Sequence, residues 1–353
     1  TMSGVAASVG LLVLAMQWND SLNYLGQSYF YNAQHQDATI GFAEPQSDTI
    51  VRDFEHLPGV LAVEPMRIVG ADLSVGPVTH RGSLTGLDRE AWLQPIFDDA
   101  TSSVIPVPPD GLVLGTVLAE KLGVSIGDHV WLEVLEGRRP ELSLPVVRLV
   151  ETYIAMPAFI SNDALNRMLK ERPSAGYVNV LIDRRHEAAF YARLKEQPQV
   201  SSVMLRQAAI DSFYGTIVEH IMVFITLFSA LACALGFGVA YNSARIALSE
   251  RGRELATLRV LGLSRGEISY ILLGEVGLLI TLALPFGCLL GRGLSGLMAS
   301  AFNTELFRVP LTIEPSTYGL SVIIAITAAL ISVFVVRHRL DHLDLIAVLN
   351  TRE

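Results

Sequence analysis

Long apolar runs without charge separate the membrane-spanning parts of this sequence from its soluble parts. Residues 221–240 and 317–336 contain no charged side chain, and each has about the 20 residues that a helix needs to cross a bilayer core. A third run, residues 269–291, carries Glu275 and Pro285, and membrane helices accept both when protein surrounds them. We therefore predict spans at residues 216–241, 269–291 and 317–336.

The first 16 residues are apolar but shorter than a span. They have no basic flank and no small-residue cleavage site, so they do not match a signal peptide. We interpret residues 1–16 as a partial first transmembrane helix that begins upstream of this sequence. The expected membrane part is an α-helical four-span unit with a truncated first span.

Arginines predict the orientation, because positive residues in short loops stay on the cytoplasmic side. Residues 242–268 contain five arginines and residues 337–353 contain three, whereas residues 292–316 contain two. The first two segments are therefore expected in the cytoplasm, and residues 292–316 and 17–215 outside. The sequence predicts a multi-pass protein of the cell (inner) membrane with a cytoplasmic C-terminus and a large extracytoplasmic domain.

The extracytoplasmic segment alternates strand and helix patterns, which indicates an α+β domain. A strand–helix–strand pattern in residues 38–66 returns in residues 177–205. Three positions match at a constant offset: Pro58 with Pro198, Val60 with Val200 and Val63 with Val203. We expect the two parts to form one unit in space. Between them, glycines separate apolar runs such as 129–134 and 144–150, which predicts an inserted β subdomain.

Composition excludes several classes of protein. Hydrophobic residues make up 51% of the chain and charged residues 17%, against about a quarter charged in ordinary soluble chains, so a disordered protein is excluded. The net charge of −9 argues against a nucleic-acid partner. Cys233 and Cys288 lie in apolar runs and are interpreted as small buried hydrophobes. We expect no cofactor and no metal.

The sequence has no GxxxxGK[ST] phosphate loop, so ATP hydrolysis would have to come from a partner. Gly262, Ser264 and Gly266 fit the G-x-S-x-G pattern of a hydrolase nucleophile elbow, which requires a strand before the serine. The preceding residues are helical in pattern, which favours a helix junction instead. Gly262 would end one helix, with Arg259 in its last turn, and Ser264 with Glu267 would begin the next as a capping box.

Three further features of the spans and their flanks need interpretation. Glu275 would serve as a proton or substrate relay, or it would form a structural pair with Arg265. We favour the structural pair, because Glu275 is a lone residue near the interface. His338 and His342 have the spacing of a metal pair, but a solvated face beside the membrane is favoured. Gly287 and Gly291 form a GxxxG spacing, which indicates close helix packing and no chemistry.

The segment between the second and third spans has the character of a docking surface. Leu248, Leu255 and Leu258 fall on one side of a helix, although Arg251 interrupts the stripe. The segment SERGRELATLRVLGLSRGEI, residues 249–268, resembles the signature of FtsX/MacB-type permeases of ABC transporters. The order of spans and loops and the tail HRLDHLDLIAVLNTRE, residues 338–353, are similar to this family as well.

The resemblance implies that residues 242–268 form a cytoplasmic coupling helix that docks on a separate ABC ATPase subunit. The residues expected to couple are Glu250, Arg251, Glu254, Leu258, Arg259, Gly262 and Arg265. It also implies a MacB-like outer domain, a porter-type part with an inserted β part. Further partners would be a second permease unit, fused upstream or as a homodimer, membrane lipids and a periplasmic adaptor. MacB itself has an ATPase domain before its first span, whereas this sequence is expected to be the C-terminal four-helix unit of a longer permease or to be trimmed within its first helix.

The family implies a non-catalytic permease subunit that moves its outer domain for export or extraction of a lipophilic, peptide or lipoprotein substrate. An FtsX-like signal transmitter that controls outer enzymes without transport is the alternative. An enzyme with its site in the outer domain is a third interpretation. It is disfavoured because Asp98 and Asp99 are adjacent, and the outer histidines are scattered at His56, His80, His129 and His186.

Overall fold

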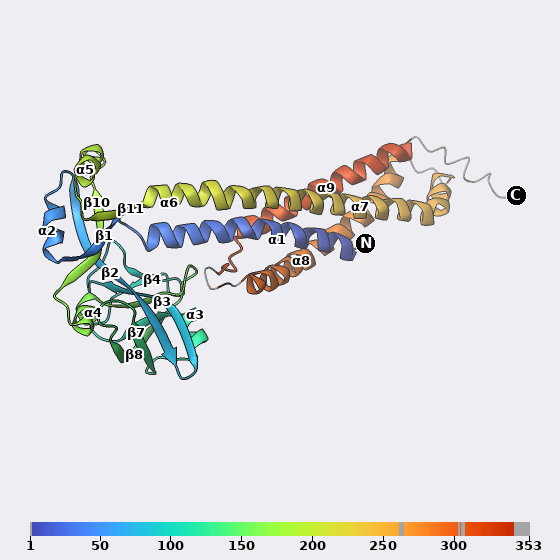
Figure 1. Cartoon of the computed structure of the whole chain (residues 1–353). Helices are drawn as coiled ribbons and strands as arrows, with labels where there is room; N and C mark the ends of the chain where they lie inside the picture. The colour runs from blue at the N-terminus through green and yellow to red at the C-terminus, as the bar shows by residue number, and fades with distance from the viewer. Residues whose placement is uncertain (1, 261–264, 303, 305–307, 342–353) are drawn as a thin grey trace. The chain divides into compact units, whose positions relative to one another are not determined.

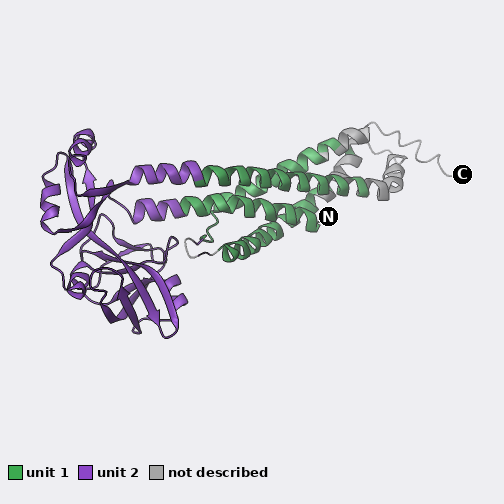
Figure 2. Cartoon of the chain, viewed as in Figure 1, with its two compact units in different colours: residues 1–24, 217–302, 309–353 green, residues 25–216, 303–308 purple. Residues whose placement is uncertain are grey.

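The computed structural model describes residues 2–260, 265–302, 304 and 308–341. These residues form two compact units (Figures 1 and 2). We call residues 1–24, 217–302 and 309–353 the helical unit, and residues 25–216 and 303–308 the α+β unit.

The helical unit contains the long helices α1 (Met2–Gly26), α7 (Glu219–Val260), α8 (Arg265–Ala301) and α9 (Pro315–Asp341). The described residues provide four stretches long and apolar enough to cross a membrane, at Met2–Asn32, Arg206–Ser243, Gly277–Ala301 and Pro315–Ser332. Together with the α+β unit, they confirm the predicted fold class of four membrane helices and a large α+β domain.

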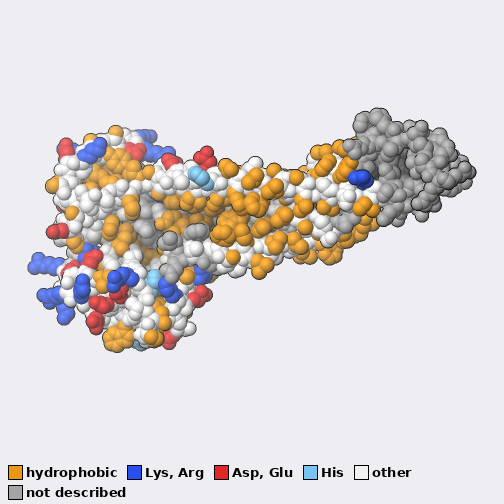
Figure 3. Space-filling view, turned by 45° about the vertical axis from the view of Figure 1, so that its right-hand side comes forward, with side chains coloured by type: hydrophobic (Ala, Val, Ile, Leu, Met, Phe, Trp, Pro, Cys, Tyr) orange, Lys and Arg blue, Asp and Glu red, His pale blue; other side chains and the backbone are white. Residues whose placement is uncertain are grey.

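Hydrophobic side chains cover the surface of the helical unit in Figure 3, whereas Lys, Arg, Asp and Glu gather on the α+β unit. Large apolar side chains are exposed along α7, α8 and α9, among them Leu227, Leu231, Leu282, Phe286, Leu289, Ile323, Leu330 and Phe334. Exposed apolar surface of this extent is typical of helices in contact with lipid.

The first helix is longer than the apolar run that marks it in the sequence. α1 continues beyond Met16 to Gly26, and a π-helical segment, η1 (Gln27–Asn32), follows. Gln17, Asp20 and Ser21 interrupt the apolar run, yet all three are buried. Their side chains hydrogen-bond to the chain around Pro310 and Glu314, so the polar stretch is satisfied without ending the helix.

The charged segment after the second span is likewise part of a longer helix. Residues 219–260 form one helix, α7, without a break between the apolar span and the charged residues. α6 (Arg206–Ser212) and the π-helical η2 (Phe213–Val218) precede α7 directly. The coupling segment expected from the sequence is thus, as far as Val260, the end of the second membrane helix.

The described residues of the α+β unit form a nine-stranded sheet with the order β11-β1-β10-β2-β3-β9-β6-β8-β7. Its strands are β1 (Ala38–Ser47), β2 (Val60–Val75), β3 (Val78–Leu87), β6 (Leu112–Gly115), β7 (His129–Val134), β8 (Glu141–Val150), β9 (Ala158–Ser161), β10 (Ser174–Ile182) and β11 (Val200–Leu205). A separate pair joins β4 (Ile96–Asp98) to β5 (Ser103–Ile105). The connecting helices are α2 (Thr49–Glu55), α3 (Thr116–Leu122), α4 (Asn162–Leu169) and α5 (Glu187–Leu194).

The two strand–helix–strand parts pair with each other, which confirms that they form one unit. β1 lies between β10 and β11, antiparallel to both, and β10 also pairs with β2. Their shared core contains Ile40 from β1, Phe54 from α2, Val178 from β10 and Phe190 from α5. The halves therefore complete one hydrophobic core that neither can bury alone.

The inserted part closes on itself through the long strand β2. β2 pairs with both β3 and β7, and the order β2-β3-β9-β6-β8-β7 returns to β2 as a ring. Val69, Ala71 and Leu73 are buried at every second position of β2, as expected for a strand with one face on a core. They share that core with Leu114 and Leu132.

Candidate functional site

α1 is the central helix of the helical unit. Half of its apolar window is buried, against 17% to 28% for the other three candidate spans in the described residues. Val9, Leu12 and Val13 are fully buried and pack with Ala232 of α7 and Ala325 of α9. A change in the position of α1 therefore reaches all of its neighbours through direct contact.

The GxxxG spacing of α8 brings this helix close to α1. A Cβ placed on Gly287 would lie 2.5 Å from Cβ of Val9, and a Cβ on Gly291 would lie 2.6 Å from Cβ of Val13. Gly10 faces them from α1, since a Cβ there would lie 3.3 Å from the backbone nitrogen of Gly291. The structure confirms the predicted packing role, because only glycine allows backbones to approach so closely.

Small residues also separate α1 from α7. A Cβ on Gly236 of α7 would lie 2.5 Å from the hydroxyl oxygen of Ser8, and a Cβ on Gly4 of α1 would lie 2.8 Å from Val239. Cys233 and Cys288 are free and pack beside the same core, but they are only partly buried, whereas the sequence predicted buried residues. The close contacts of α1 with α7 and α8 thus depend on residues with small side chains.

The C-terminal part of α1 contacts the segment that precedes α9. The Ser21 hydroxyl and the Gln17 amide donate to the carbonyl of Pro310, at 2.6 Å and 3.3 Å. The Asp20 carboxylate accepts from the backbone N–H of Glu314 at 3.0 Å, one residue before α9 begins. Trp18 packs edge-on against Phe302 with ring centroids 5.3 Å apart. Gln17, Asp20 and Ser21 therefore position the entry of α9, whereas Trp18 contacts the residue that follows α8.

The other part of the α8–α9 connection, residues 303–308, belongs to the α+β unit. The backbone N–H of Arg308 donates to the carbonyl of Tyr153 at 2.8 Å. Its guanidinium donates to Glu151 at 3.3 Å and to Glu120 at 3.0 Å. Glu151 is held from its other oxygen by the Thr116 hydroxyl at 2.7 Å. We call Arg308, Glu151, Glu120 and Thr116 the Arg308 clasp.

The sequence did not single out this clasp as a site. Arg308 entered only as one of the few arginines of a short loop, and that isolated charge was the available signal. Its partners Glu120 and Glu151 are distant in the chain, so no local spacing connects them.

The residues predicted to couple to an ATPase lie at the end of α7 and the start of α8. Glu250, Arg251, Glu254, Leu258 and Arg259 belong to the last turns of α7, and Arg265 is the first residue of α8. Gly262 and the capping residue Ser264 lie outside the described residues. Glu275 lies within α8, and His338 within α9, whereas His342 is also outside the described residues.

Acidic groups of the α+β unit are engaged in local structure. Asp98 accepts hydrogen bonds from the Thr101 hydroxyl and from the backbone N–H of Glu151, whereas its neighbour Asp99 accepts from Ser28. Among the described residues, no group of three His, Cys, Asp or Glu side chains has the arrangement of a metal site. The two adjacent aspartates therefore face different partners.

Comparison with known proteins finds a family match in the long helices. Residues 226–342 match the family model of the FtsX-like permease C-terminal region. An uncharacterized ABC transporter permease protein of Mycobacterium tuberculosis is 25% identical over 241 residues, which cover 64% of this chain and 27% of that protein. The chain thus spans about a quarter of this relative.

Two solved structures resemble about half of the chain. The periplasmic region of MacB from Actinobacillus actinomycetemcomitans matches with 11% identity and a TM-score of 0.35, covering 55% of this chain and 99% of that one. The extracellular domain of the ABC-type transporter YknZ from Gram-positive bacteria matches with 12% identity and a TM-score of 0.33, covering 48% and 99%. The similarity to the FtsX-like permease C-terminal region thus lies in residues 226–342, which contain most of α7 and all of α8.

Proposed function

We propose that this chain is the membrane subunit of an ABC transporter of FtsX/MacB type, and that a separate cytoplasmic ATPase drives it. The observation that carries the proposal is the continuity of α7, one helix of 42 residues from Glu219 to Val260. At 1.5 Å per residue, such a helix is about 63 Å long, roughly twice the thickness of a bilayer core. Its charged end therefore extends beyond the membrane.

Continuity matters because a helix without a break moves as a rod. A displacement at residues 250–259 would move the apolar span of the same helix directly, with no loop to absorb it. The five arginines of residues 242–268 favour a cytoplasmic position for this end. The proposed role of Glu250, Arg251, Glu254, Leu258, Arg259, Gly262 and Arg265 is to receive the ATPase.

The subunit itself is proposed to be non-catalytic. The sequence has no phosphate loop, and the relative of similar sequence is named as a permease protein. Movement of the helices would reach the α+β unit, which lies outside the membrane in this proposal, and would export or extract a lipophilic, peptide or lipoprotein substrate. A second permease unit and a periplasmic adaptor are the further partners that the resemblance favours.

Charge reversal at the end of α7 tests the proposal. The chain would be purified from its native membrane, and the ATPase that accompanies it would be quantified together with its activity. Glu254→Lys should weaken that association, because a wrong charge in a partly desolvated interface is strongly unfavourable. The matched control is Glu196→Lys, which reverses a carboxylate in an exposed ion pair with Arg193 in the α+β unit.

Gly262→Val separates docking from coupling. A β-branched residue is unfavourable where a helix ends in a left-handed conformation, so the ATPase should remain bound while its stimulation by the permease falls. Full retention and full stimulation of the ATPase by Glu254→Lys would contradict the docking role. Export and signal transmission are then distinguished by reconstitution in vesicles, since only an exporter depletes its substrate from one side.

A further inference from the structure

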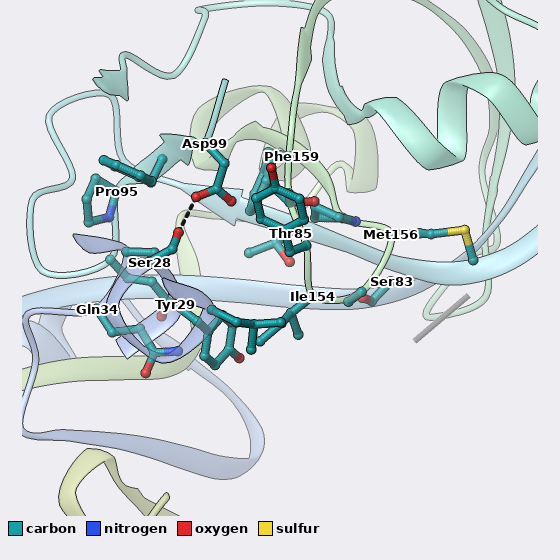
Figure 4. A pocket seen from close by; sticks show the side chains of 18 of the residues that line it. Ser28, Tyr29, Gln34, Ser83, Thr85, Pro95, Asp99, Ile154, Met156 and Phe159 are labelled. Carbon is teal, nitrogen blue, oxygen red and sulfur yellow. Dashed lines mark hydrogen bonds between the residues drawn. The ribbon is translucent and has the colours of Figure 1, made fainter. Parts of the chain in front are cut away.

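A cavity of about 240 Å³ lies inside the α+β unit. Figure 4 shows η1 on one side of it, with Ser28, Tyr29 and Gln34, and strand residues such as Thr85 and Phe159 on another. The loop between β8 and β9 supplies residues 152–157 of the wall. The volume corresponds to about eight water molecules at the ~30 Å³ that each occupies in the liquid, which is space for a molecule with one ring and a short chain.

The wall of the cavity combines eleven apolar residues with nine polar ones. Its apolar residues include Met66, Ile68, Phe97, Ile154, Met156 and Phe159. Asp99 is the one carboxylate in the described wall, which contains no Lys, Arg or His. Apolar surface together with polar groups that fix orientation is the usual composition of a small-molecule site.

The carboxylate of Asp99 is incompletely compensated by its surroundings. Burial raises the pKa of Asp99, and the nearby charges of Asp98 and Glu151 raise it further, while hydrogen bonds from the Ser28 hydroxyl and the Tyr153 backbone lower it. In Figure 4 the Ser28 hydroxyl points at the carboxylate from across the cavity wall. A positive charge placed here would therefore be stabilised.

The loop that forms part of the wall also contains an unpaired polar atom. The hydroxyl oxygen of Thr152 is buried and has no hydrogen-bond partner among the described residues. Three residues further along the same loop, Ala155 has a φ of 61°, a left-handed conformation that is unfavourable for a residue with a Cβ. An unpaired hydroxyl and a strained loop beside one cavity are features found at ligand sites.

We infer that this cavity binds a small amphiphile with a protonated amine and an apolar, ring-sized body, and that Asp99 is its counter-ion. The amine takes the place beside Asp99, and the body contacts Phe97, Met156 and Phe159. An anion is disfavoured, because three carboxylates lie near the site. A purely apolar ligand would leave the Asp99 carboxylate buried without compensation. This inference does not depend on the proposed transport function.

The test compares three molecules of one shape in calorimetric titrations of the full chain in detergent. Phenethylamine carries the cation, phenylethyl alcohol is neutral, and phenylpropanoate is an anion. Phenethylamine should bind saturably, the alcohol should bind more weakly by about tenfold or more, and phenylpropanoate should not bind. Equal affinity for the amine and the alcohol would overturn the inference.

Variants distinguish the cavity from nonspecific uptake into the micelle. Asp99→Asn should lower the affinity for phenethylamine by about tenfold or more and leave that for the alcohol unchanged. Asp110→Asn, which removes a carboxylate exposed outside the cavity, should bind as wild type. Ser83→Phe, at an exposed position of the wall, should close the cavity to both ligands.

Circular dichroism would verify that each variant is folded, and Ser83→Phe carries the test if Asp99→Asn does not fold. Unchanged binding of phenethylamine to Ser83→Phe would show that the molecule binds elsewhere. Absence of saturable binding to wild type would equally overturn the inference.

Discussion

The guanidinium of Arg308 and the carboxylate of Glu151 form an ion pair of 3.3 Å, although 157 residues separate them in the chain. Both side chains are largely buried, with exposed fractions of 19% and 26%, whereas Glu120, which completes the clasp, is 74% exposed. Exposed ion pairs contribute little to stability. The Arg308–Glu151 contact is thus the stronger half of the clasp.

Arg308→Gln should therefore destabilise the α+β unit by about 1–3 kcal/mol, because it leaves the partly buried Glu151 without its cation. Glu120→Gln is the matched control and should cost about 0–1 kcal/mol. Chemical unfolding followed by tryptophan fluorescence measures both. Equal losses in the two variants would show that burial does not distinguish the two contacts.

Substitution at the α1–α8 crossing should disrupt the helical unit. Gly291→Leu places a side chain where a Cβ already lies 2.6 Å from Val13, and overpacking of this kind costs about 1–3 kcal/mol or more. Gly293→Leu is two residues away, where a Cβ meets nothing within 4 Å, and should be tolerated. The fraction of monodisperse protein in detergent is the measurement, and equal behaviour of the two variants would contradict the contact.

Asp88 should make stability fall as pH rises. Burial raises the pKa of Asp88, and Asp48 and Asp163 act in the same direction, although a hydrogen bond from Asn162 lowers it. The folded state then binds the proton more tightly than the unfolded state, so stability is highest below the ordinary pKa and is lost as pH rises through the raised pKa. Each unit of difference corresponds to about 1.4 kcal/mol.

Asp88→Asn should consequently unfold at a higher temperature than wild type near neutral pH, and this gain should vanish in acid. Asp110→Asn, which alters an exposed carboxylate, provides the control series. Thermal unfolding across a pH series measures the effect. An advantage of Asp88→Asn that persisted unchanged in acid would point to packing and not to the charge.

The predicted orientation is tested by labelling introduced cysteines in sealed cells, in a background without Cys233 and Cys288. A cysteine at Gly137, in the α+β unit, should react with an impermeant maleimide from outside. A cysteine at Arg253 should react only after the cells are opened, because positive segments stay in the cytoplasm. Labelling of position 253 in sealed cells would reverse the topology.

The sequence predicted the parts of this fold whose signals are local. Apolar runs located the membrane helices, and the repeat of Pro58, Val60 and Val63 at Pro198, Val200 and Val203 identified halves that pair through β1 and β10. The spacing of Gly287 and Gly291 predicted a face of α8 that packs closely against another helix. Each of these signals depends on residues within one element or one repeat.

Contacts between distant residues could not be predicted in this way. α1 continues through Gln17 and Ser21 because both bond to Pro310, which lies 293 and 289 residues away. The cavity beside Asp99 and the Arg308 clasp likewise combine residues from segments that are far apart in the chain. A single sequence contains no local pattern that reports such pairings.

The loop from Glu151 to Pro157 has two sides, and they are thermodynamically linked. One side is the wall of the cavity, and on the other the Tyr153 carbonyl and the Glu151 carboxylate bind Arg308. A ligand that orders this loop increases the affinity of the loop for Arg308. By thermodynamic linkage, Arg308 increases the affinity of the cavity for that ligand by the same factor. A substitution of Arg308 that breaks the clasp would therefore lower the affinity of the cavity for its ligand, although Arg308 does not line the cavity.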